Sequence, residues 1–463
     1  MRGKIALGTK PKAIVWGFDT YIACYAINEL ESQNYIDVKQ WYGNSYFQAV
    51  EVKDWYDIIL KKLKPEQLKR CDDETYNYIY SHLSVYLDLC SRCYVFEHKP
   101  IHECINAMHL LMDYYYSIIV DEKIDLFLTD DIPHGPASFI LYLLAKALKI
   151  KVLILFQSHF PNKFFYLKTI EDYGWFKEVP EYNLGDSKIL VEKKYEKNWF
   201  YSNQNWTPKP KVKSFKEWKE KNLNKLHRSL RKYDGFYDML MQKKIKKLNN
   251  SYFDNQYKAN YKRYFASNID LLKRFVYFPL HLQPEMTTSI LGGIYNDQLL
   301  AVERTAAIIP DDWYIYVKEY PKQSHYMRGK YFFERLSLIP KVKTVKSDVN
   351  TYDLIRNSQF VSTLVGTAGW EAISGGKNVL IFGHAWYRSL PGVFAYSPDL
   401  TTEEIMNYQI DHKELEERLS TLLKKTGIGT TCIDYLPLVG ESFDPEENNK
   451  NIFRFLADFI PQL

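Results

Sequence analysis

A glycine turn between two short apolar runs carries residues that could hold a phosphate. Residues 360–365 and 379–382 are apolar, and they flank a Gly-Thr-Ala-Gly turn at 366–369 and a short helical stretch. This order predicts a strand, a turn, a helix and a second strand of a parallel sheet. Such a turn presents free backbone N–H groups and a helix N-terminus at the carboxyl ends of the strands, where phosphates bind.

Side chains in and after this turn extend the predicted phosphate site. Thr367 supplies a hydroxyl donor, and Glu371 lies one turn into the helix, where its carboxylate could accept hydrogen bonds from a ribose diol. Trp386 and Tyr387 follow the second run and could stack on a base or a sugar, or fill the wall of the site. The same pattern also fits an ordinary unit of a doubly wound domain that touches no ligand.

Carboxylates and a histidine gather after two other predicted strands. Glu285 follows a proline beyond the apolar residues 274–280, a position with little use in packing. Asp130, Asp131 and His134 share one short loop of the N-terminal half. A carboxylate or an imidazole at such a place can take a proton from a hydroxyl group. The loop residues fit equally well a turn in which an aspartate caps the next helix.

Strands and helices alternate in both halves of the chain, which predicts an α/β protein with parallel sheets. Its 463 residues suffice for two or three domains. Two α/β halves with ligand-type loops at their strand ends indicate a GT-B-like fold, in which two Rossmann-like domains face a central cleft. The expected parts are an N-terminal α/β domain on the acceptor side, a basic helical connection, a C-terminal α/β nucleotide-sugar-binding domain and a final helix, over residues 1–207, 208–265, 266–445 and 446–463.

Apolar runs rich in β-branched and aromatic residues mark the strands most clearly. They lie at residues 12–16, 126–128, 151–156, 274–280, 313–317, 342–345, 360–365 and 379–382. Helices are expected between them, and the helix after the glycine turn is predicted to open at Trp370.

The composition excludes several other classes of protein. Hydrophobic residues make up 46% of the chain and charged residues 25%, the proportions of a globular protein with ample core. A net charge of +5 gives no argument for nucleic acid as a partner. The N-terminal residues lack the apolar region of a signal peptide, and lysines interrupt the apolar residues 139–156. We therefore expect a cytoplasmic protein, with any attachment to the inner membrane peripheral.

Six cysteines in a chain of this length do not form a disulfide framework. Cys90, Cys93 and Cys104, with His98 and His102 between them, raise the alternative of a metal site. Zinc normally requires two well-spaced pairs of ligands, whereas these residues lie in one helical region, so buried thiols are favoured. We expect no metal and no cofactor.

Residues 208–263 differ in charge from the rest of the chain. They contain 17 Lys and Arg against 5 Asp and Glu, a local excess of 12 positive charges. One interpretation is a set of solvated surface helices. The other is a basic face that docks on an anionic membrane surface or on an anionic glycan.

Three motifs of the second half connect these residues to a known family. They are FPLHLQPE at residues 278–285, IYVKEYP at 315–321 and GTAGWEAISGGKNVLIFGHAWY at 366–387. In order and spacing, over about residues 275–392, they resemble the capsule polysaccharide biosynthesis family, which includes bacterial Kdo transferases. The resemblance implies a GT-B glycosyltransferase that moves a sugar from a nucleotide donor, with CMP the expected nucleotide, to a glycan or lipid-linked acceptor.

The resemblance also assigns residues to the donor. The acidic residue of the family's short helix is expected at the ribose, and here it is Glu371. Members usually carry a His-Pro pair at the donor phosphate, where this chain has Tyr320-Pro321, so the positive charge must come from other groups. The available candidates are Lys318, Lys322 and the backbone amides of Gly366 and Thr367. The complete expected donor site is Gln283, Lys318, Tyr320, Gly366, Thr367, Glu371 and Tyr387.

The catalytic residues implied by the resemblance depart from the Kdo transferases. Those enzymes carry an Asp shortly after the Gln, thought to act as a nucleophile in a retaining mechanism, and Thr287 occupies that position here. Glu285 is the only carboxylate of the motif and is expected to stabilise or attack the anomeric carbon, across from Asp131 and His134. Two alternatives stay open, a non-catalytic partner in capsule assembly or export, and a nucleotide-sugar epimerase with the same two-domain plan.

Overall fold

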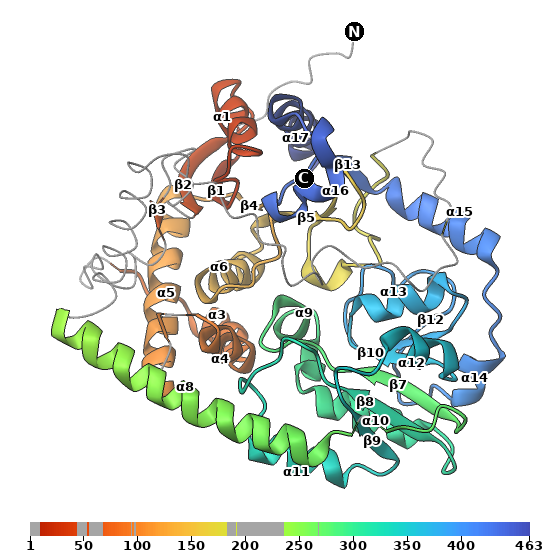
Figure 1. The fold of residues 1–463 in the computed structure, drawn as a ribbon. Coiled ribbons are helices and arrows are strands. Elements are labelled where there is room, and N and C mark those ends of the chain that lie inside the picture. The colour runs from red at the N-terminus through yellow and green to blue at the C-terminus, as the bar shows by residue number, and fades with distance from the viewer. Residues whose placement is uncertain are drawn as a thin grey trace.

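Two sheets, each covered by helices, form the framework of the chain (Figure 1). The computed structural model describes residues 10–43, 53–54, 68–93, 95–96, 99–182, 191, 236–266 and 268–463. The first sheet lies in the upper part of the view in Figure 1 and the second in the lower part.

The first sheet has seven strands in the order β13-β6-β5-β4-β1-β2-β3. Neighbouring strands from β3 to β5 are parallel, whereas β6 is antiparallel to β5 and β13 is antiparallel to β6. The parallel part has a doubly wound order, whose direction of winding reverses between β1 and β4. The strands are β1 Lys12–Trp16, β2 Asp37–Gly43, β3 Lys53–Asp54, β4 Leu126–Thr129, β5 Lys151–Gln157, β6 Lys163–Leu167 and β13 Thr426–Ile428.

Helices from residues 73–122 of the first unit pack around α6, which is apolar on nearly all sides. Its buried residues run without interruption from Pro136 to Ala145, and it contacts β5 as well as α3, α4 and α5. A helix that is hydrophobic all round is stable only when it is enclosed in this way. The helices are α1 Cys24–Ser32, α3 Asp73–Tyr80, α4 Leu83–Ser91, α5 Ile101–Glu122 and α6 Pro136–Ala147.

The second sheet has six strands, all parallel, in the order β12-β11-β10-β7-β8-β9. Its strands are β7 Phe275–Pro279, β8 Tyr314–Lys318, β9 Val342–Val345, β10 Val361–Thr363, β11 Val379–Ile381 and β12 Val393–Ala395. Its helices are α9 Met286–Ser289, α10 Gln298–Ile308, α11 Lys330–Leu338, α12 Thr351–Asn357, α13 Thr367–Ser374, α14 Thr402–Asn407 and α15 His412–Leu423.

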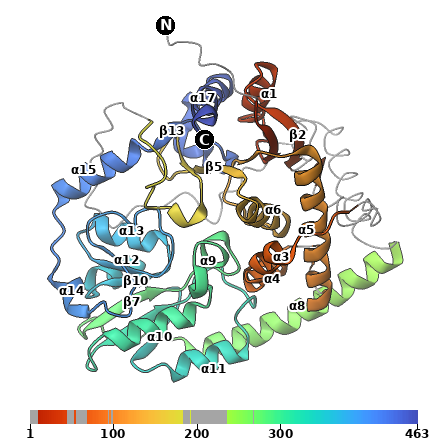
Figure 2. The same ribbon diagram turned by 180° about the vertical axis from the view of Figure 1, so that it is seen from behind.

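The end of the chain returns to the first unit. After α15, β13 joins the first sheet, and α17 (Pro445–Phe459) packs on α1 and β13, as Figure 2 shows from behind. The buried Asn448 and Asn449 amides bond the backbone of residues 21 and 22, which fixes this return. Short helical turns complete the structure at α16 Leu436–Val439, η2 Ile170–Asp172, η4 Gly293–Asn296, η5 Ile433–Tyr435, η6 Gly440–Ser442 and η7 Ile460–Gln462.

One long helix, α8 (Phe236–Tyr264), runs along the lower rim of the molecule in both views. It contacts α11 of the second unit. Its residues 236–263 are the described part of the basic segment predicted at 208–263, and residues 208–235 lie outside the described residues. Within the described residues, no helix combines the length and the apolar character needed to cross a bilayer.

The predicted α/β class with two Rossmann-like units is confirmed, and most strands lie within a residue or two of their expected places. The helix after the glycine turn begins at Thr367 and not at Trp370, because the extended backbone of Gly366 caps it directly. The division at residues 207, 265 and 445 and the central cleft stay predictions. The strand β13, which lies within 266–445, belongs to the first sheet.

None of the six cysteines, all of which lie in the described part of the chain, forms a disulfide bond. Cys90, Cys93 and Cys104 are buried, as the sequence favoured, while His98 lies outside the described residues. In the described part of the chain no three His, Cys, Asp or Glu side chains are grouped as metal ligands.

Candidate functional site

Asp130 lies directly beneath the turn that follows β1. Gly17 has a φ of +77°, and a Cβ atom built there would lie 1.7 Å from Asp130 Oδ1. The Phe18 N–H donates to Asp130 Oδ2 at 2.5 Å. Burial raises the pKa of the Asp130 carboxyl well above its usual range, and the charge of Asp19 raises it further. Asp130 therefore joins the ends of β1 and β4.

Asp131 and His134, on the loop before α6, form a pair suited to taking up a proton. The Asp131 Oδ1 accepts from the Ile132 N–H at 2.8 Å, and its Oδ2 lies 3.4 Å from His134 Nδ1. That Nδ1 also lies 2.8 Å from the Ile132 carbonyl oxygen. Because a carbonyl only accepts, Nδ1 carries a hydrogen, which leaves Nε2 as the ring atom that can take up a proton. The two side chains are 46% and 35% exposed, so substrate groups can reach them.

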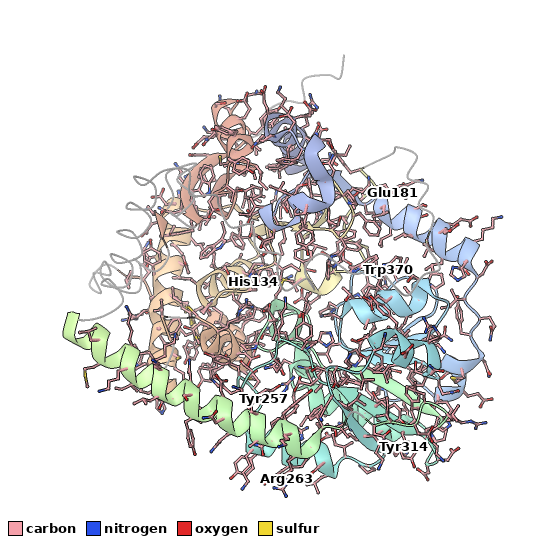
Figure 3. All side chains as sticks on the ribbon, viewed as in Figure 1. His134, Glu181, Tyr257, Arg263, Tyr314 and Trp370 are labelled. Atoms are coloured by element: carbon pink, nitrogen blue, oxygen red, sulfur yellow. The ribbon has the colours of Figure 1, made fainter. Side chains whose placement is uncertain are left out.

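Burial raises the pKa of Asp131, while His134 and, more weakly, Arg92 lower it. Because nearly half of the side chain is exposed, water limits the rise. Figure 3 labels His134 and Trp370, which lie in the region between the two sheets.

The glycine turn of the second sheet is supported by two side chains. A Cβ atom on Gly366 would lie 2.8 Å from His281 Nε2, which accepts from the Val365 N–H at 3.3 Å. The buried Tyr387 hydroxyl donates to the Gly366 carbonyl at 2.5 Å, and a Cβ on Gly369 would lie 2.1 Å from that hydroxyl oxygen. Burial lowers the pKa of His281 to about 4, so the ring is neutral. These two buried side chains thereby fix the turn that leads into the first N–H groups of α13.

Lys318, at the end of β8, is under the electrostatic influence of Glu371 in α13. The Lys318 Nζ donates to the Val349 carbonyl at 2.5 Å and to Thr351 Oγ1 at 2.6 Å. Burial lowers the pKa of Lys318 to about 8, and the negative charges of Asp348 and Glu371 oppose that shift. Because Lys318 is buried and bonded to its own unit, it is less available to a ligand than the sequence suggested.

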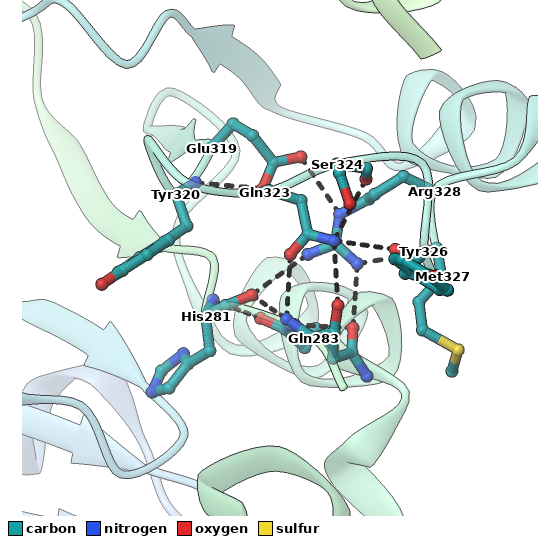
Figure 4. Close-up of polar contacts among 10 residues, drawn as sticks. His281, Gln283, Glu319, Tyr320, Gln323, Ser324, Tyr326, Met327 and Arg328 are labelled. Carbon is teal, nitrogen blue, oxygen red and sulfur yellow. Dashed lines mark hydrogen bonds and ion pairs between the residues drawn. The ribbon is translucent and has the colours of Figure 1, made fainter. Parts of the chain in front are cut away.

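Gln283 belongs to a buried polar network at the ends of β7 and β8 (Figure 4). Its Oε1 accepts from Gln298 Nε2 at 2.7 Å and from Arg328 Nη1 at 2.8 Å. Arg328, which is 1% exposed, pairs with Glu319 at 3.0 Å. The Glu319 Oε1 in turn accepts from the Tyr320 N–H at 3.0 Å. Buried groups satisfied in this way fix the two loops that carry Glu285 and Tyr320.

Glu285 contacts the first unit at Arg92, which the sequence did not indicate as a site residue. Glu285 precedes α9 and is 41% exposed, and its Oε2 lies 3.8 Å from Nη2 of Arg92, at the end of α4. The charge of Arg92 also acts on Asp131. Burial, and then the charge of Glu285, raise the pKa of Tyr320. Charge interactions that run from the first unit to the second therefore link Asp131 to Arg92, Arg92 to Glu285, and Glu285 to Tyr320.

Further contacts join the two units on both sides of these four residues. Ser289 Oγ donates to the buried Asp88 Oδ2 at 3.0 Å. Arg388 donates to the Glu171 carbonyl and lies over the Trp175 ring at 4.9 Å. These contacts hold the carboxyl edge of the second sheet against loops of the first unit.

The predicted residues therefore fall into three groups. Arg92 contacts Glu285 and acts electrostatically on Asp131, the partner of His134, and Glu285 acts on Tyr320. Gly366, Thr367 and Glu371 belong to α13 and its N-cap, and the charge of Glu371 acts on Lys318. Gln283 and Tyr387 are buried as supports of the neighbouring loops. Their roles toward a ligand stay predictions. Arg92 was missed because its neighbours in the sequence, Cys90 and Cys93, indicated only buried thiols.

Residues 219–425 match the family model described as capsule polysaccharide biosynthesis protein. This range contains all six strands of the second sheet and the helices from α8 to α15. The resemblance predicted from the three motifs is therefore confirmed. Among curated proteins, none matches the sequence.

Several solved structures show distant similarity. The β-Kdo 2,7 transferase KpsC of Thermosulfurimonas dismutans has 12% identity over 73% of this chain and 88% of its own, with a TM-score of 0.31. HepE of Anabaena, in complex with UDP-glucose, has 11% identity over 97% and 100%, with a TM-score of 0.28. The UDP-GlcNAc 2-epimerase of Methanocaldococcus jannaschii has 11% identity over 97% and 99%, with a TM-score of 0.24. Likenesses this distant do not assign a substrate.

Proposed function

From the match of residues 219–425 to the capsule polysaccharide biosynthesis family, we propose that this protein is a glycosyltransferase of bacterial capsule or surface polysaccharide. It transfers a sugar from a nucleotide donor, with CMP the expected nucleotide, to a glycan or lipid-linked acceptor. The geometric observation that supports the proposal is the contact of Glu285 with Arg92 across the two units, together with the effect of the Arg92 charge on Asp131, the partner of His134.

The donor binds at the second sheet. The first N–H groups of α13 and the Thr367 hydroxyl bond the phosphate, and Glu371 bonds the ribose diol. The neutral His281 beneath Gly366 holds the turn without adding a charge of its own. Tyr320 donates a hydrogen bond where relatives carry a histidine, so Arg92 supplies the nearby positive charge for the leaving phosphate.

The transfer step forms one bond and breaks another. The acceptor hydroxyl oxygen forms a bond to the anomeric carbon, while the bond from that carbon to the donor phosphate breaks and the nucleotide leaves with the electron pair. His134 Nε2, oriented by the Ile132 carbonyl and by Asp131, takes the hydroxyl proton. The Glu285 carboxylate stabilises the positive charge that develops on the anomeric carbon.

Turnover of a panel of CMP-, CDP- and UDP-sugars, with and without a lipid-linked acceptor, tests the proposal. We expect release of the nucleotide to depend on the acceptor and on one class of nucleotide. Absence of binding to CMP, CDP and UDP in isothermal titration would contradict it.

A non-catalytic role in capsule assembly is the second candidate, because Tyr320 and Thr287 replace the His and Asp of the related transferases. Hydrolysis of a nucleotide sugar that disappears in Glu285→Ala excludes this candidate. Formation of an epimerised free sugar from UDP-HexNAc without acceptor would instead identify an epimerase.

A further inference from the structure

The first half of α8 exposes an apolar stripe to solvent. Met241, Ile245, Leu248 and Tyr252 are between 41% and 63% exposed. Their spacings of four, three and four residues place them on one face of a helix. At 1.5 Å per residue the stripe is about 17 Å long. Contiguous apolar surface of this kind on a soluble protein commonly marks an interaction site.

The stripe points away from the rest of the molecule. Further along α8, Tyr257 and Tyr264 pack on Phe333 of α11, with ring centroids 6.0 and 5.8 Å apart, and the Tyr261 hydroxyl bonds Ser347 Oγ at 3.1 Å. These anchoring tyrosines lie about 160° around the helix axis from the stripe, since successive residues are about 100° apart. Figures 1 and 2 accordingly show α8 on the outer rim.

Lysines flank the stripe or lie behind it. At about 100° per residue, Lys244 lies about 70° from the centre of the stripe and Lys246 and Lys247 about 130° to either side, whereas Lys243 lies almost opposite. Lys243, Lys244 and Lys247 are exposed on the same two turns. A shallow groove along the helix is lined by Lys243, Lys246, Lys247 and Lys258. Residues 240–264 contain seven Lys and Arg against one acidic residue, Asp254, which is paired with His325 at 2.6 Å. The segment thus combines an apolar strip with an excess of positively charged residues.

From these features we infer that the exposed face of α8, residues 240–252, docks on an anionic lipid surface. Apolar side chains enter the boundary between headgroups and acyl chains, while lysines meet the phosphates. A second copy of the chain fits less well, because two such faces would bring like charges together. Four half-exposed side chains also fall short of the roughly 800 Å² per partner that a stable interface buries.

The inference rests on the proposed function for its choice of partner, because a lipid-linked acceptor is presented at a membrane surface. Its test does not require activity. Flotation of the full chain is measured with phosphatidylcholine vesicles, with and without phosphatidylglycerol, at low and high salt.

We expect the wild-type chain to float with anionic vesicles and much less with neutral ones. Replacing the two lysines nearest the stripe that are exposed (Lys244→Gln, Lys247→Gln) should reduce binding about thirtyfold at low salt and much less at high salt. Ile245→Ser with Leu248→Ser should reduce binding at least about tenfold at both salt concentrations. Leu338→Ser, at a position 80% exposed on α11, is the matched control and should float like the wild type.

Three results would overturn the inference. They are no preference of the wild type for anionic vesicles, unchanged flotation of the Ile245→Ser, Leu248→Ser variant, and a dimer in solution that this variant dissociates. Nucleotide titration of the wild-type chain, beside its flotation, separates this inference from the proposed function. Vesicle binding without nucleotide binding would refute the enzyme alone, and nucleotide binding without vesicle binding would refute the docking surface alone.

Discussion

The carboxyl edges of the two sheets use the same backbone arrangement with opposite chemistry. In each, a glycine turn lies against a side chain that a Cβ atom would displace. Beneath Gly17 that side chain is the Asp130 carboxyl group, and beneath Gly366 it is the His281 imidazole. The first edge therefore gathers carboxyl groups, among which burial raises the pKa of Asp130 well above its usual range, whereas the second presents backbone amides over a neutral ring.

We expect this difference to assign the two tasks of a transferase, phosphate binding and proton uptake, to different edges. Amides over a neutral imidazole can receive a phosphate, because no fixed negative charge opposes it. The carboxyl-rich edge exposes the Asp131 and His134 side chains and suits the uptake of a proton from a hydroxyl group. Arg92 lies where the two edges meet and is attracted to both Asp131 and Glu285.

The largest effect is expected for Glu285→Gln. This variant keeps size and hydrogen bonding but removes the charge opposite the developing positive centre, so we expect kcat to fall at least about a hundredfold. Donor affinity should change little, since the group acts mainly in the transition state. Steady-state kinetics and donor titration measure the two quantities.

Glu334→Gln is the matched control for that substitution. Glu334 is 42% exposed and pairs with Lys330 at 3.5 Å, much as Glu285 pairs with Arg92. Its replacement should leave kcat unchanged. Nearly full activity of Glu285→Gln would move the central role to Asp131.

Gly366→Ala should weaken nucleotide binding by at least about tenfold. The new methyl group would lie 2.8 Å from His281 Nε2, and relief of such overpacking moves the backbone that presents the amides. Gly329→Ala is the control, because Gly329 also precedes a helix but has open space around its Cβ position. Partial recovery of affinity in Gly366→Ala with His281→Ala would support this cause, and equal affinities of the Gly366→Ala and Gly329→Ala variants would exclude it.

A smaller effect is expected in the pH dependence of Arg92→Gln. Burial already raises the pKa of Asp131, and Arg92 partly opposes that rise. Loss of the positive charge should raise the pKa further, so the acidic limb of kcat/KM against pH moves to higher pH, by less than about one unit. A limb that stays in place or moves to lower pH would show that Asp131 does not control it.

Local patterns were sufficient to predict the strands and the edges they share. The runs at 12–16 and 342–345 appear as β1 and β9 with the predicted bounds, because each is a short apolar or β-branched run between clear breaks. The antiparallel β6 and β13 were not predicted. Their pairing brings residues 163–167 and 426–428 together, and such a distant partner leaves no periodic signal in the sequence.

The buried residues that support the site could not be predicted either, because their partners are also distant in the sequence. Gln283 was assigned to the donor, yet its oxygen bonds Gln298 and Arg328 in the core, partners that only the folded chain brings together. Tyr387 likewise bonds Gly366 across 21 residues. Chemical type can be recognised in a sequence, whereas the direction of a side chain depends on tertiary contacts.

Isothermal titration with CMP of the wild type, Glu371→Ala and Asp131→Asn tests the central claim most directly, because it asks which edge holds the nucleotide. A carboxylate bonded to a ribose diol contributes roughly 1.5–3 kcal/mol, so Glu371→Ala should lose about tenfold to a hundredfold in affinity. Asp131→Asn should bind CMP like the wild type. Equal loss in both variants, or unchanged affinity in Glu371→Ala, would contradict the division of tasks between the two edges.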